Sequence, residues 1–316
     1  MPNLGERGGI NRAERYRQEH VASFATVRTA YFSVSRNGTI AWRCGTAVVS
    51  QVVIFDRKGN RTGTAGTAAP IESIRLSPDG SRLVAYGEGT SWIVDANGSG
   101  RVSLNHASFG DYLWSPDSSR LLFAGTGKIW EMPASDPSQT RVLADIPGGI
   151  PFLRGIPSDG RRILYNNGSG LFFVALDGKG APERVTGASG NAGLSPDGTW
   201  IVYASTPESG IYTQFLSGTS MPRQIANRGS GVVWRADGKE ILYEEREKIW
   251  SVRVESSGAA LRFGTPELLF TAAAPMGLNN GSHPMAVNRD GSRIYFLQSA
   301  EQPQSGVIQV RTAAVR

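Results

Sequence analysis

The chain has 316 residues, of which 40% are hydrophobic, 39 are glycine and 17 are proline; this composition supports a buried core with many turns and excludes a disordered or collagen-like chain. Lys and Arg exceed Asp and Glu by 33 to 27, without a basic run of five or more, so we expect no nucleic-acid partner. The single cysteine, Cys44, excludes an intrachain disulfide and a zinc site made of several cysteines.

The N-terminal stretch MPNLGERGGINRAERYRQEH lacks the apolar region of a signal peptide. No segment of the chain approaches the roughly 18 consecutive apolar residues of a membrane-spanning helix. We therefore expect a flexible segment over residues 1–14, no membrane span and a monomer. The localisation stays open, because the chain is cytoplasmic as it stands and extracytoplasmic if it is part of a receptor-like protein.

A short turn motif recurs along the chain and sets the order of the predicted strands. Its copies are VSRNGTIAWRC from Val34, LSPDGSRLVAY from Leu76, WSPDSSRLLFA from Trp114, IPSDGRRILYN from Ile156, LSPDGTWIVYA from Leu194, WRADGKEILYE from Trp234 and VNRDGSRIYFL from Val287. The turn glycine, or the serine that replaces it at Ser118, recurs at intervals of 42, 38, 42, 38, 40 and 53 residues. Intervals of about 40 residues are typical of a four-stranded propeller blade.

Each repeat predicts four strands in the same order. A short apolar strand such as SIRLS precedes the turn, and a strand rich in branched and aromatic residues, such as RLVAY, follows it. A third strand such as SWIVD and a more polar fourth such as RVSLN complete the unit. The second and third strands are apolar on both faces, so each sheet must be covered on both sides, as in radially arranged blades.

Seven turn markers predict an all-β, seven-bladed β-propeller of four-stranded antiparallel blades, with six blades as the alternative. The last repeat, from His283 onward, supplies only three strands before the chain ends. We therefore expect a strand from residues 15–27 to become its outer strand and to close the ring. The prediction is a single propeller domain over residues 15–316.

The turn residues recur at the same positions in each repeat, which indicates a backbone role. Proline presets φ, aspartate accepts hydrogen bonds from its own turn, and glycine takes the left-handed conformation that closes the hairpin. Ser118 replaces that glycine and predicts a strained or differently closed turn. We assign this structural role, rather than a catalytic or cation-binding one, to Asp79, Gly80, Asp117, Asp159, Gly160, Asp197, Gly198, Asp237, Gly238, Asp290 and Gly291.

The SPDGxxLxY hairpins, with a later strand such as KIW or IY, resemble the TolB-like, WD40-like propeller repeats of bacteria. The order FSVSRNGTIAW, FDRKGNRTGTAG, IRLSPDGSRL, WSPDSSRLLFAG, LSPDGTWIVYAS, WRADGKEILYEE and VNRDGSRIYFL resembles the C-terminal propeller of certain bacterial receptor-like serine/threonine kinases. This resemblance spans roughly residues 30–316. It implies a β-propeller with a sensor role, because a kinase domain and a membrane helix precede the propeller in that family.

Motifs for catalysis and metal binding are missing from the sequence: it contains no GxSxG, HExxH or GxxxxGK[ST]. A histidine-based metal centre would need most of His20, His106 and His283 together, and the last two each precede an inner strand. Asp95 begins DANGSG, which has the oxygen spacing that starts a calcium loop but lacks the later bidentate glutamate. We therefore predict no metal, no cofactor and no catalytic residue.

Propellers bind ligands and partners at the mouth of the central channel, on loops that lead into inner strands. The polar residues at those places are Arg75, Asp111, Arg154, Asn280 and His283. Asp111 could pair with either arginine, in an ion pair between blades or in a ligand site, and both interpretations stay open. The longest loop, residues 271–283, is the predicted partner-contact element.

We predict a non-catalytic β-propeller that binds a protein or a small ligand at the channel face. One alternative is a sensor propeller detached from a receptor kinase. The other is a propeller lyase or hydrolase at the central channel, which would require His106 and His283 to converge with a carboxylate or a metal.

Overall fold

The computed structural model describes residues 32–35, 40–43, 49–87, 90–104, 111–125, 127–146, 151–186, 190–204, 209–216, 220–257, 260–272, 283–300 and 308–311. The chain forms two compact units, residues 1–48 with 301–316, and residues 49–300. No helix in the described part of the chain is long and apolar enough to cross a membrane.

The first unit contains a three-stranded antiparallel sheet in the order β1-β2-β28. Its strands are β1 (Phe32–Val34), β2 (Ile40–Arg43) and β28 (Ile308–Arg311). The strands β1 and β2 flank the first turn marker, Gly38, which lies outside the described residues. They pair with a strand from the end of the chain instead of starting a four-stranded blade.

The second unit contains six sheets, here called blades 1 to 6. Blade 1 is β5 (Ser73–Leu76), β6 (Arg82–Gly87), β7 (Thr90–Asp95) and β8 (Arg101–Ser103), and blade 2 is β9 (Tyr112–Trp114), β10 (Arg120–Gly125), β11 (Lys128–Pro133) and β12 (Arg141–Asp145). Blade 3 is β13 (Phe152–Gly155), β14 (Arg162–Asn166), β15 (Leu171–Ala175) and β16 (Glu183–Thr186), and blade 4 is β17 (Asn191–Leu194), β18 (Trp200–Ala204), β19 (Ile211–Phe215) and β20 (Arg223–Ala226). Blade 5 is β21 (Ser230–Trp234), β22 (Glu240–Glu245), β23 (Lys248–Ser257), β24 (Ala260–Phe263) and β25 (Glu267–Thr271). Blade 6 is β26 (Met285–Val287), β27 (Ile294–Ser299), β3 (Ser50–Phe55) and β4 (Arg61–Ala69).

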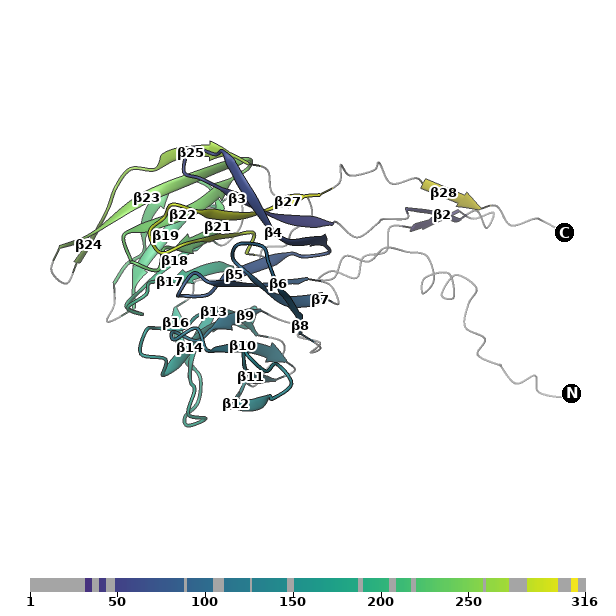
Figure 1. Cartoon of the computed structure of the whole chain (residues 1–316). Coiled ribbons are helices and arrows are strands. Elements are labelled where there is room, and N and C mark those ends of the chain that lie inside the picture. Colours follow the sequence, from purple (N-terminus) through teal and green to yellow (C-terminus); the bar gives the residue numbers. More distant parts are fainter. Residues whose placement is uncertain are drawn as a thin grey trace, which may run out of the picture. The chain divides into compact units, whose positions relative to one another are not determined.

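The six sheets close into a ring. The inner strands β5, β9, β13, β17, β21 and β26 each contact the next, and β26 contacts β5 again (Figure 1). Six hydrophobic clusters of described residues fill the interfaces between successive blades, so every sheet is covered on both faces. Residues 49–300 are therefore a six-bladed β-propeller. The all-β fold and its four-stranded blades are confirmed, whereas the count of seven is not, and the structure has the alternative of six.

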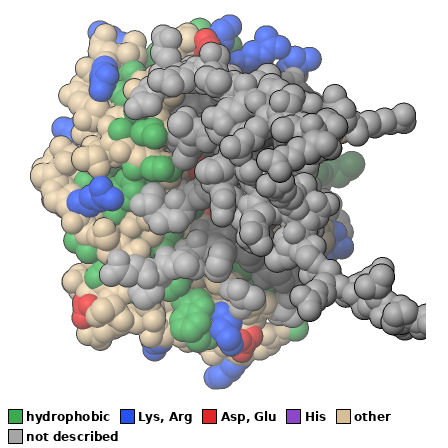
Figure 2. Space-filling model, turned by 90° about the vertical axis from the view of Figure 1, so that its right-hand side faces the viewer, with side chains coloured by type: hydrophobic (Ala, Val, Ile, Leu, Met, Phe, Trp, Pro, Cys, Tyr) green, Lys and Arg blue, Asp and Glu red, His purple; other side chains and the backbone are tan. Residues whose placement is uncertain are grey.

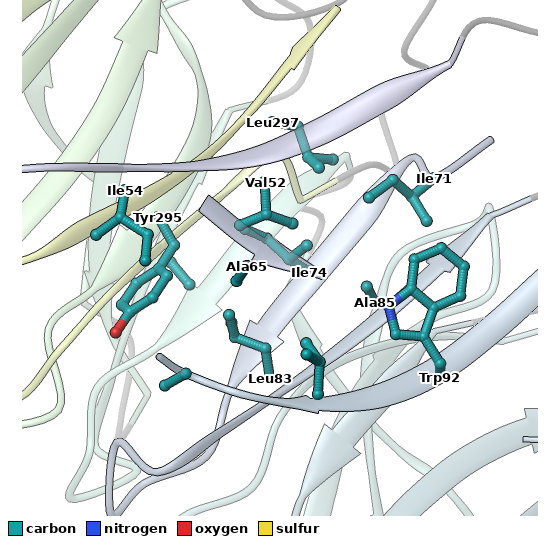
Figure 3. Packing of buried hydrophobic residues seen from close by; sticks show 13 residues of the cluster. Val52, Ile54, Ala65, Ile71, Ile74, Leu83, Ala85, Trp92, Tyr295 and Leu297 are labelled. Atoms are coloured by element: carbon teal, nitrogen blue, oxygen red, sulfur yellow. The ribbon is translucent and has the colours of Figure 1, made fainter. Parts of the chain in front are cut away.

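The ring is closed by two strands near the N-terminus of the second unit. In blade 6, β27 pairs with β3 in the register Ile294↔Phe55 to Ser299↔Ser50, and β3 pairs with β4; Figure 1 shows the yellow β27 beside the purple β3. Val52 of β3 and Leu297 of β27 pack with Trp92 of blade 1 in the core that seals this closure (Figure 3). The predicted closing segment, residues 15–27, lies outside the described residues.

Blade 5 has an extra strand that the repeat pattern did not predict. The long strand β23 pairs with β25, the outer strand of the blade, and farther along with β24. Phe263 of β24 packs on Trp200 and Trp234, with ring centroids 5.8 and 6.4 Å apart. This hairpin accounts for part of the longest interval between turn markers, which is 53 residues.

The turns between first and second strands have the backbone chemistry that their residues imply. In blade 1, Asp79 accepts hydrogen bonds from the amide of Ser81 at 3.0 Å and from the hydroxyl of Ser77 at 2.5 Å, and Gly80 has φ of 75°. Ser118 takes the same left-handed conformation, with φ of 62°. Its hydroxyl accepts a hydrogen bond from the Asp79 amide at 3.1 Å, which offsets the strain of a side chain in this conformation.

The boundaries of the propeller domain stay a prediction at both ends. Every described blade strand lies within residues 49–300, whereas the predicted domain extends over residues 15–316. The predicted flexible segment, residues 1–14, lies outside the described residues.

Candidate functional site

Four polar side chains from four different blades meet on the axis of the ring. We call Arg75, Asp111, Arg154 and His283 the axial cluster. Oδ2 of Asp111 is 3.1 Å from Nη2 of Arg75, 3.3 Å from Nε2 of His283 and 3.6 Å from Nη1 of Arg154. Arg154 of blade 3 also approaches His283, which directly precedes blade 6, with Nη1 2.7 Å from Nε2. Because blades 3 and 6 are opposite each other in a ring of six, this contact lies on the axis.

A β-bulge directs Arg154 toward the axis. The register between β13 and β14 shifts between Leu153 and Gly155, so Arg154 is an extra residue in the inner strand. Leu153 is fully buried in the core between blades 2 and 3. A side chain at Gly155 would clash with Leu194 of blade 4, 2.6 Å away. Bulges re-aim single side chains and are frequent beside functional sites.

The backbone of His283 is fixed between blades 6 and 1. Its amide donates to the hydroxyl of Ser73 at 2.9 Å, and its carbonyl accepts from the amide of Ile74, also at 2.9 Å. Arg75 follows in the same strand, and its Nη2 also donates to the carbonyl of Leu153 at 3.4 Å. The four residues therefore lie within or directly before inner strands, so the packing of these strands in the ring fixes the positions of their side chains.

The contacts define the protonation state of the cluster. An arginine can only donate, so Nε2 of His283 accepts the hydrogen bond from Arg154 and the proton of the neutral ring lies on Nδ1. Burial and the nearby Arg75 lower the pKa of His283 to about 3, so the ring is neutral at pH 7. Burial opposes ionisation of Asp111, but Arg75 and the other neighbours outweigh it and hold the pKa of this carboxyl below its usual value.

The four side chains of the axial cluster together carry one net positive charge. Arg75 and Arg154 contribute two positive charges and Asp111 one negative charge, while His283 is neutral. Burial, together with the repulsion from Arg75, lowers the pKa of Arg154 to about 10 despite the attraction of Asp111. The site is therefore electropositive although it contains an ion pair.

Arg75, Asp111 and His283 each have one polar atom that lacks a hydrogen-bond partner among the residues that the structure describes. These atoms are Nε of Arg75, Oδ1 of Asp111 and Nδ1 of His283. The side chains of Asp111 and His283 are 2% and 0% exposed, whereas that of Arg75 is 16% exposed. Buried polar atoms without a partner are uncommon in folded proteins. Arg75 is thus the member of the cluster that solvent reaches most easily.

The structure brings together four of the five residues predicted for the channel mouth. Asn280 and most of the loop 271–283 lie outside the described residues, as do His20 and His106, so the convergence of His106 with His283 stays a prediction. In the described ranges, no three His, Cys, Asp or Glu side chains are grouped to hold a metal ion. The oxygens of the suspected calcium loop serve its own turn, because the hydroxyl of Ser99 donates to Asp95 at 3.1 Å and to Asn97 at 2.7 Å.

One further acidic residue was missed by the sequence reasoning. Glu244 of β22 pairs with Ser230 of β21, and burial raises the pKa of its carboxyl to about 7. Glu244 and Pro284 both lie beside Gly231. A Cβ on Gly231 would be 3.8 Å from Cβ of Glu244 and 3.5 Å from Cγ of Pro284. Glu244 is therefore near Pro284, at the entry to blade 6. The signal was a charged residue near the end of the apolar strand EILYE.

The ring is similar to solved structures of several proteins. A protein of Agrobacterium tumefaciens assigned as TolB matches with a TM-score of 0.60 and 19% identity, over 81% of this chain and 100% of that chain. A functionally unknown protein of Desulfotomaculum acetoxidans matches with a TM-score of 0.51 and 13% identity, over 90% and 95%. Hydrazine synthase of Kuenenia stuttgartiensis matches with a TM-score of 0.50 and 14% identity, also over 90% and 95%.

These likenesses show the fold. The chain has a β-propeller fold, as the repeat motifs implied, and it shares this fold with the Agrobacterium tumefaciens protein assigned as TolB. No protein-family model and no curated protein sequence matches it. The likeness to the propellers of receptor kinases stays a prediction.

Proposed function

We propose that this chain is a non-catalytic binding module that receives a protein or a small ligand at the end of the ring where the inner strands begin. The observation that carries the proposal is the axial cluster, with its net positive charge and three unpartnered polar atoms at the meeting point of four blades. A ligand that supplies partners to these atoms would remove a cost that the folded protein otherwise keeps.

The protonation states in the cluster support binding rather than catalysis. A general acid or base works best with a pKa near the operating pH. His283 is neutral, and its Nε2 is occupied by Arg154, while Asp111 is held ionised. Neither group is ready to exchange a proton near pH 7, which disfavours the lyase or hydrolase alternative at this cluster.

The charge distribution on the face drawn in Figure 2 gives no support to a nucleic-acid partner. On the face drawn in Figure 2, the described Lys and Arg side chains stand in separate groups between hydrophobic and other side chains. Nucleic-acid binding usually depends on a continuous basic surface that contacts several phosphates. A protein or small ligand fits this surface better. A sensor role, in which the ligand is the signal, is compatible with the same site.

A thermal-shift screen of small acids, neutral metabolites and short peptides tests the proposal. We expect hits whose binding, measured by calorimetry, is lost in Arg75→Gln and kept in Arg162→Gln. Arg162 is a suitable control because its guanidinium stacks on Phe173 at 4.1 Å and has no contact to the cluster among the described residues. Conversion of a hit into a product by the purified protein would contradict a non-catalytic role. If all hits bind Arg75→Gln as tightly as the unaltered protein, the binding site lies elsewhere on the chain.

A further inference from the structure

We infer that the axial cluster is a binding site for a single carboxylate group whose neighbouring atoms include a hydrogen-bond donor. This inference rests on the proposed function and names the chemistry of its ligand. The carboxyl terminus of a peptide and a small hydroxy or amino acid share this chemistry.

The charge of the cluster selects a monoanion. Two guanidinium groups face one carboxylate and a neutral imidazole, so one positive charge has no counter-charge in the cluster. A buried charge is costly unless it is paired. One carboxylate would neutralise the site, whereas a phosphate dianion would add a second negative charge beside Asp111.

The unpartnered atoms define which groups the ligand must offer. Nε of Arg75 and Nδ1 of His283 are donors, and a carboxylate is an acceptor for both. Oδ1 of Asp111 is an acceptor, so it requires a donor from the ligand. A hydroxyl, ammonium or peptide N–H next to the carboxylate supplies that donor. A simple anion such as chloride would satisfy the charge of the cluster but not Asp111.

The burial of the cluster limits the size of the bound group. Arg154, Asp111 and His283 are between 0% and 2% exposed, and they fill the axis with contacts from opposite blades. Arg75, at 16%, is the exposed edge of the cluster. A small terminal group can approach Arg75 and Asp111 together, whereas a side chain in the middle of a folded surface could not insert as far.

The test uses the full chain and six probes in calorimetry: glycolate, glycolamide, sodium chloride, inorganic phosphate, and a short peptide in two forms, one with a free and one with an amidated carboxyl terminus. We expect glycolate and the free peptide to bind, and glycolamide, chloride and the amidated peptide to bind at least about tenfold more weakly, a difference of about 1.4 kcal/mol. Stronger binding of glycolate than of the free peptide would identify a small acid as the ligand, and the reverse would identify a chain terminus.

Variants separate this site from the rest of the surface. Arg75→Gln should weaken the binding of glycolate by about tenfold or more, Arg75→Lys should restore part of it, and Arg162→Gln should leave it unchanged. Phosphate that binds more tightly than glycolate, or glycolate binding that survives Arg75→Gln, would overturn the carboxylate assignment.

The outcomes also separate this inference from the proposed function. If neutral ligands bind in an Arg75-dependent manner and acids do not, the binding module stands and the carboxylate assignment fails. If no probe and no ligand from the thermal-shift screen binds at this face, both fail. If Arg75→Gln does not fold, the comparison of glycolate with glycolamide on the unaltered protein still decides the assignment.

Discussion

Two of the buried carboxylates in the ring, Glu240 and Asp111, each face two arginines, and they differ in how completely they are paired. Glu240 of blade 5 accepts hydrogen bonds on both oxygens: from Arg57 at 2.7 and 3.0 Å, from Arg235 at 2.6 Å, and from the hydroxyl of Ser251. Arg235 also pairs with Asp237. Two positive and two negative charges therefore balance. Asp111, in contrast, receives all its contacts on Oδ2, in a cluster with an excess positive charge.

The arginines of the two clusters show the same difference. Hydrogen bonds to Asp237 are the main cause that raises the pKa of Arg235, whereas burial lowers the pKa of Arg154 to about 10. The fully paired, neutral cluster between blades 5 and 6 is what we call a structural tie, an ion-pair network that stabilises the contact between two blades. An electropositive cluster with unpartnered atoms costs stability, which proteins accept mainly at functional sites.

The two clusters should differ most in how they change the free energy of unfolding at acid pH. The folded pKa of His283, about 3, lies below its unfolded value near 6.5. The unfolded chain therefore binds a proton that the folded chain does not, and stability present above pH 6.5 is lost as the pH falls toward 3. This loss is up to about 5 kcal/mol, because each pKa unit is worth about 1.4 kcal/mol.

Urea unfolding at pH 7, 5.5 and 4 measures this loss. We expect the slope of unfolding free energy against pH to become shallower in His283→Gln and to stay as it is in Glu240→Gln above pH 5. An unchanged slope in His283→Gln would show that the imidazole is not held neutral, and the charge assigned to the axial cluster would be wrong.

Removing one arginine from the paired cluster should be the next largest effect. Arg235→Gln leaves Glu240 and Asp237 with fewer donors and a net negative charge, so we expect a loss of about 3 kcal/mol in the free energy of unfolding. The side chain of Arg235 is 13% exposed, close to the 16% of Arg75. Urea denaturation at pH 7 measures the change, with the exposed turn residue Arg289→Gln as the control. A loss below about 1 kcal/mol would mean that this cluster is not a structural tie.

Glu244 provides a carboxylate whose pKa is dominated by burial instead of by a cation. Its folded pKa of about 7 lies above the unfolded value of 4.5. The stability it contributes is present below pH 4.5 and is lost as the pH rises through 7. At pH 8 we expect Glu244→Gln to stabilise the protein by about 2 kcal/mol, and at pH 4 to have no effect. Thermal unfolding at the two pH values checks this, and an equal effect at both would refute the raised pKa.

The repeat made the blades and their turns predictable, because each blade encodes the same local chemistry. Asp79 and Gly80 could be assigned from the residues around them alone. The sequence also predicted that an N-terminal segment completes the last blade, but it did not indicate β3 and β4, because they have the pattern of any third and fourth strand. Nothing local indicates that their inner partner β27 is more than two hundred residues away, at Ile294–Ser299. Likewise, β1 and β2 have the motif of a first blade but pair with β28.

The members of the axial cluster were predictable one by one, because Arg75 and Arg154 interrupt apolar inner strands. Their convergence on the axis of the ring was not predictable. The contact between Arg154 and His283 depends on the bulge at Leu153–Gly155 and on the number of blades. In a ring of seven, no two blades are directly opposite. The sequence supported an ion pair between neighbouring blades, which the structure contains, because Asp111 of blade 2 contacts Arg75 of blade 1 and Arg154 of blade 3. The sequence did not indicate the further contact between opposite blades, Arg154 with His283.

The smallest expected effect on stability is the most informative, because it contrasts with Arg235→Gln. Arg75→Gln removes the excess charge of the axial cluster and leaves Arg154 and Asp111 as a neutral pair. The lost hydrogen bond between Arg75 and Asp111 and the relieved repulsion between the two arginines act in opposite directions, so we expect a net change within about 1 kcal/mol. Urea denaturation at pH 7, with Arg162→Gln as the matched control, measures it. If Arg75→Gln costs as much as Arg235→Gln, both clusters are structural ties, and the ligand site lies elsewhere on the ring. If it costs little while acid binding is lost, Arg75 is retained for the ligand and not for the fold.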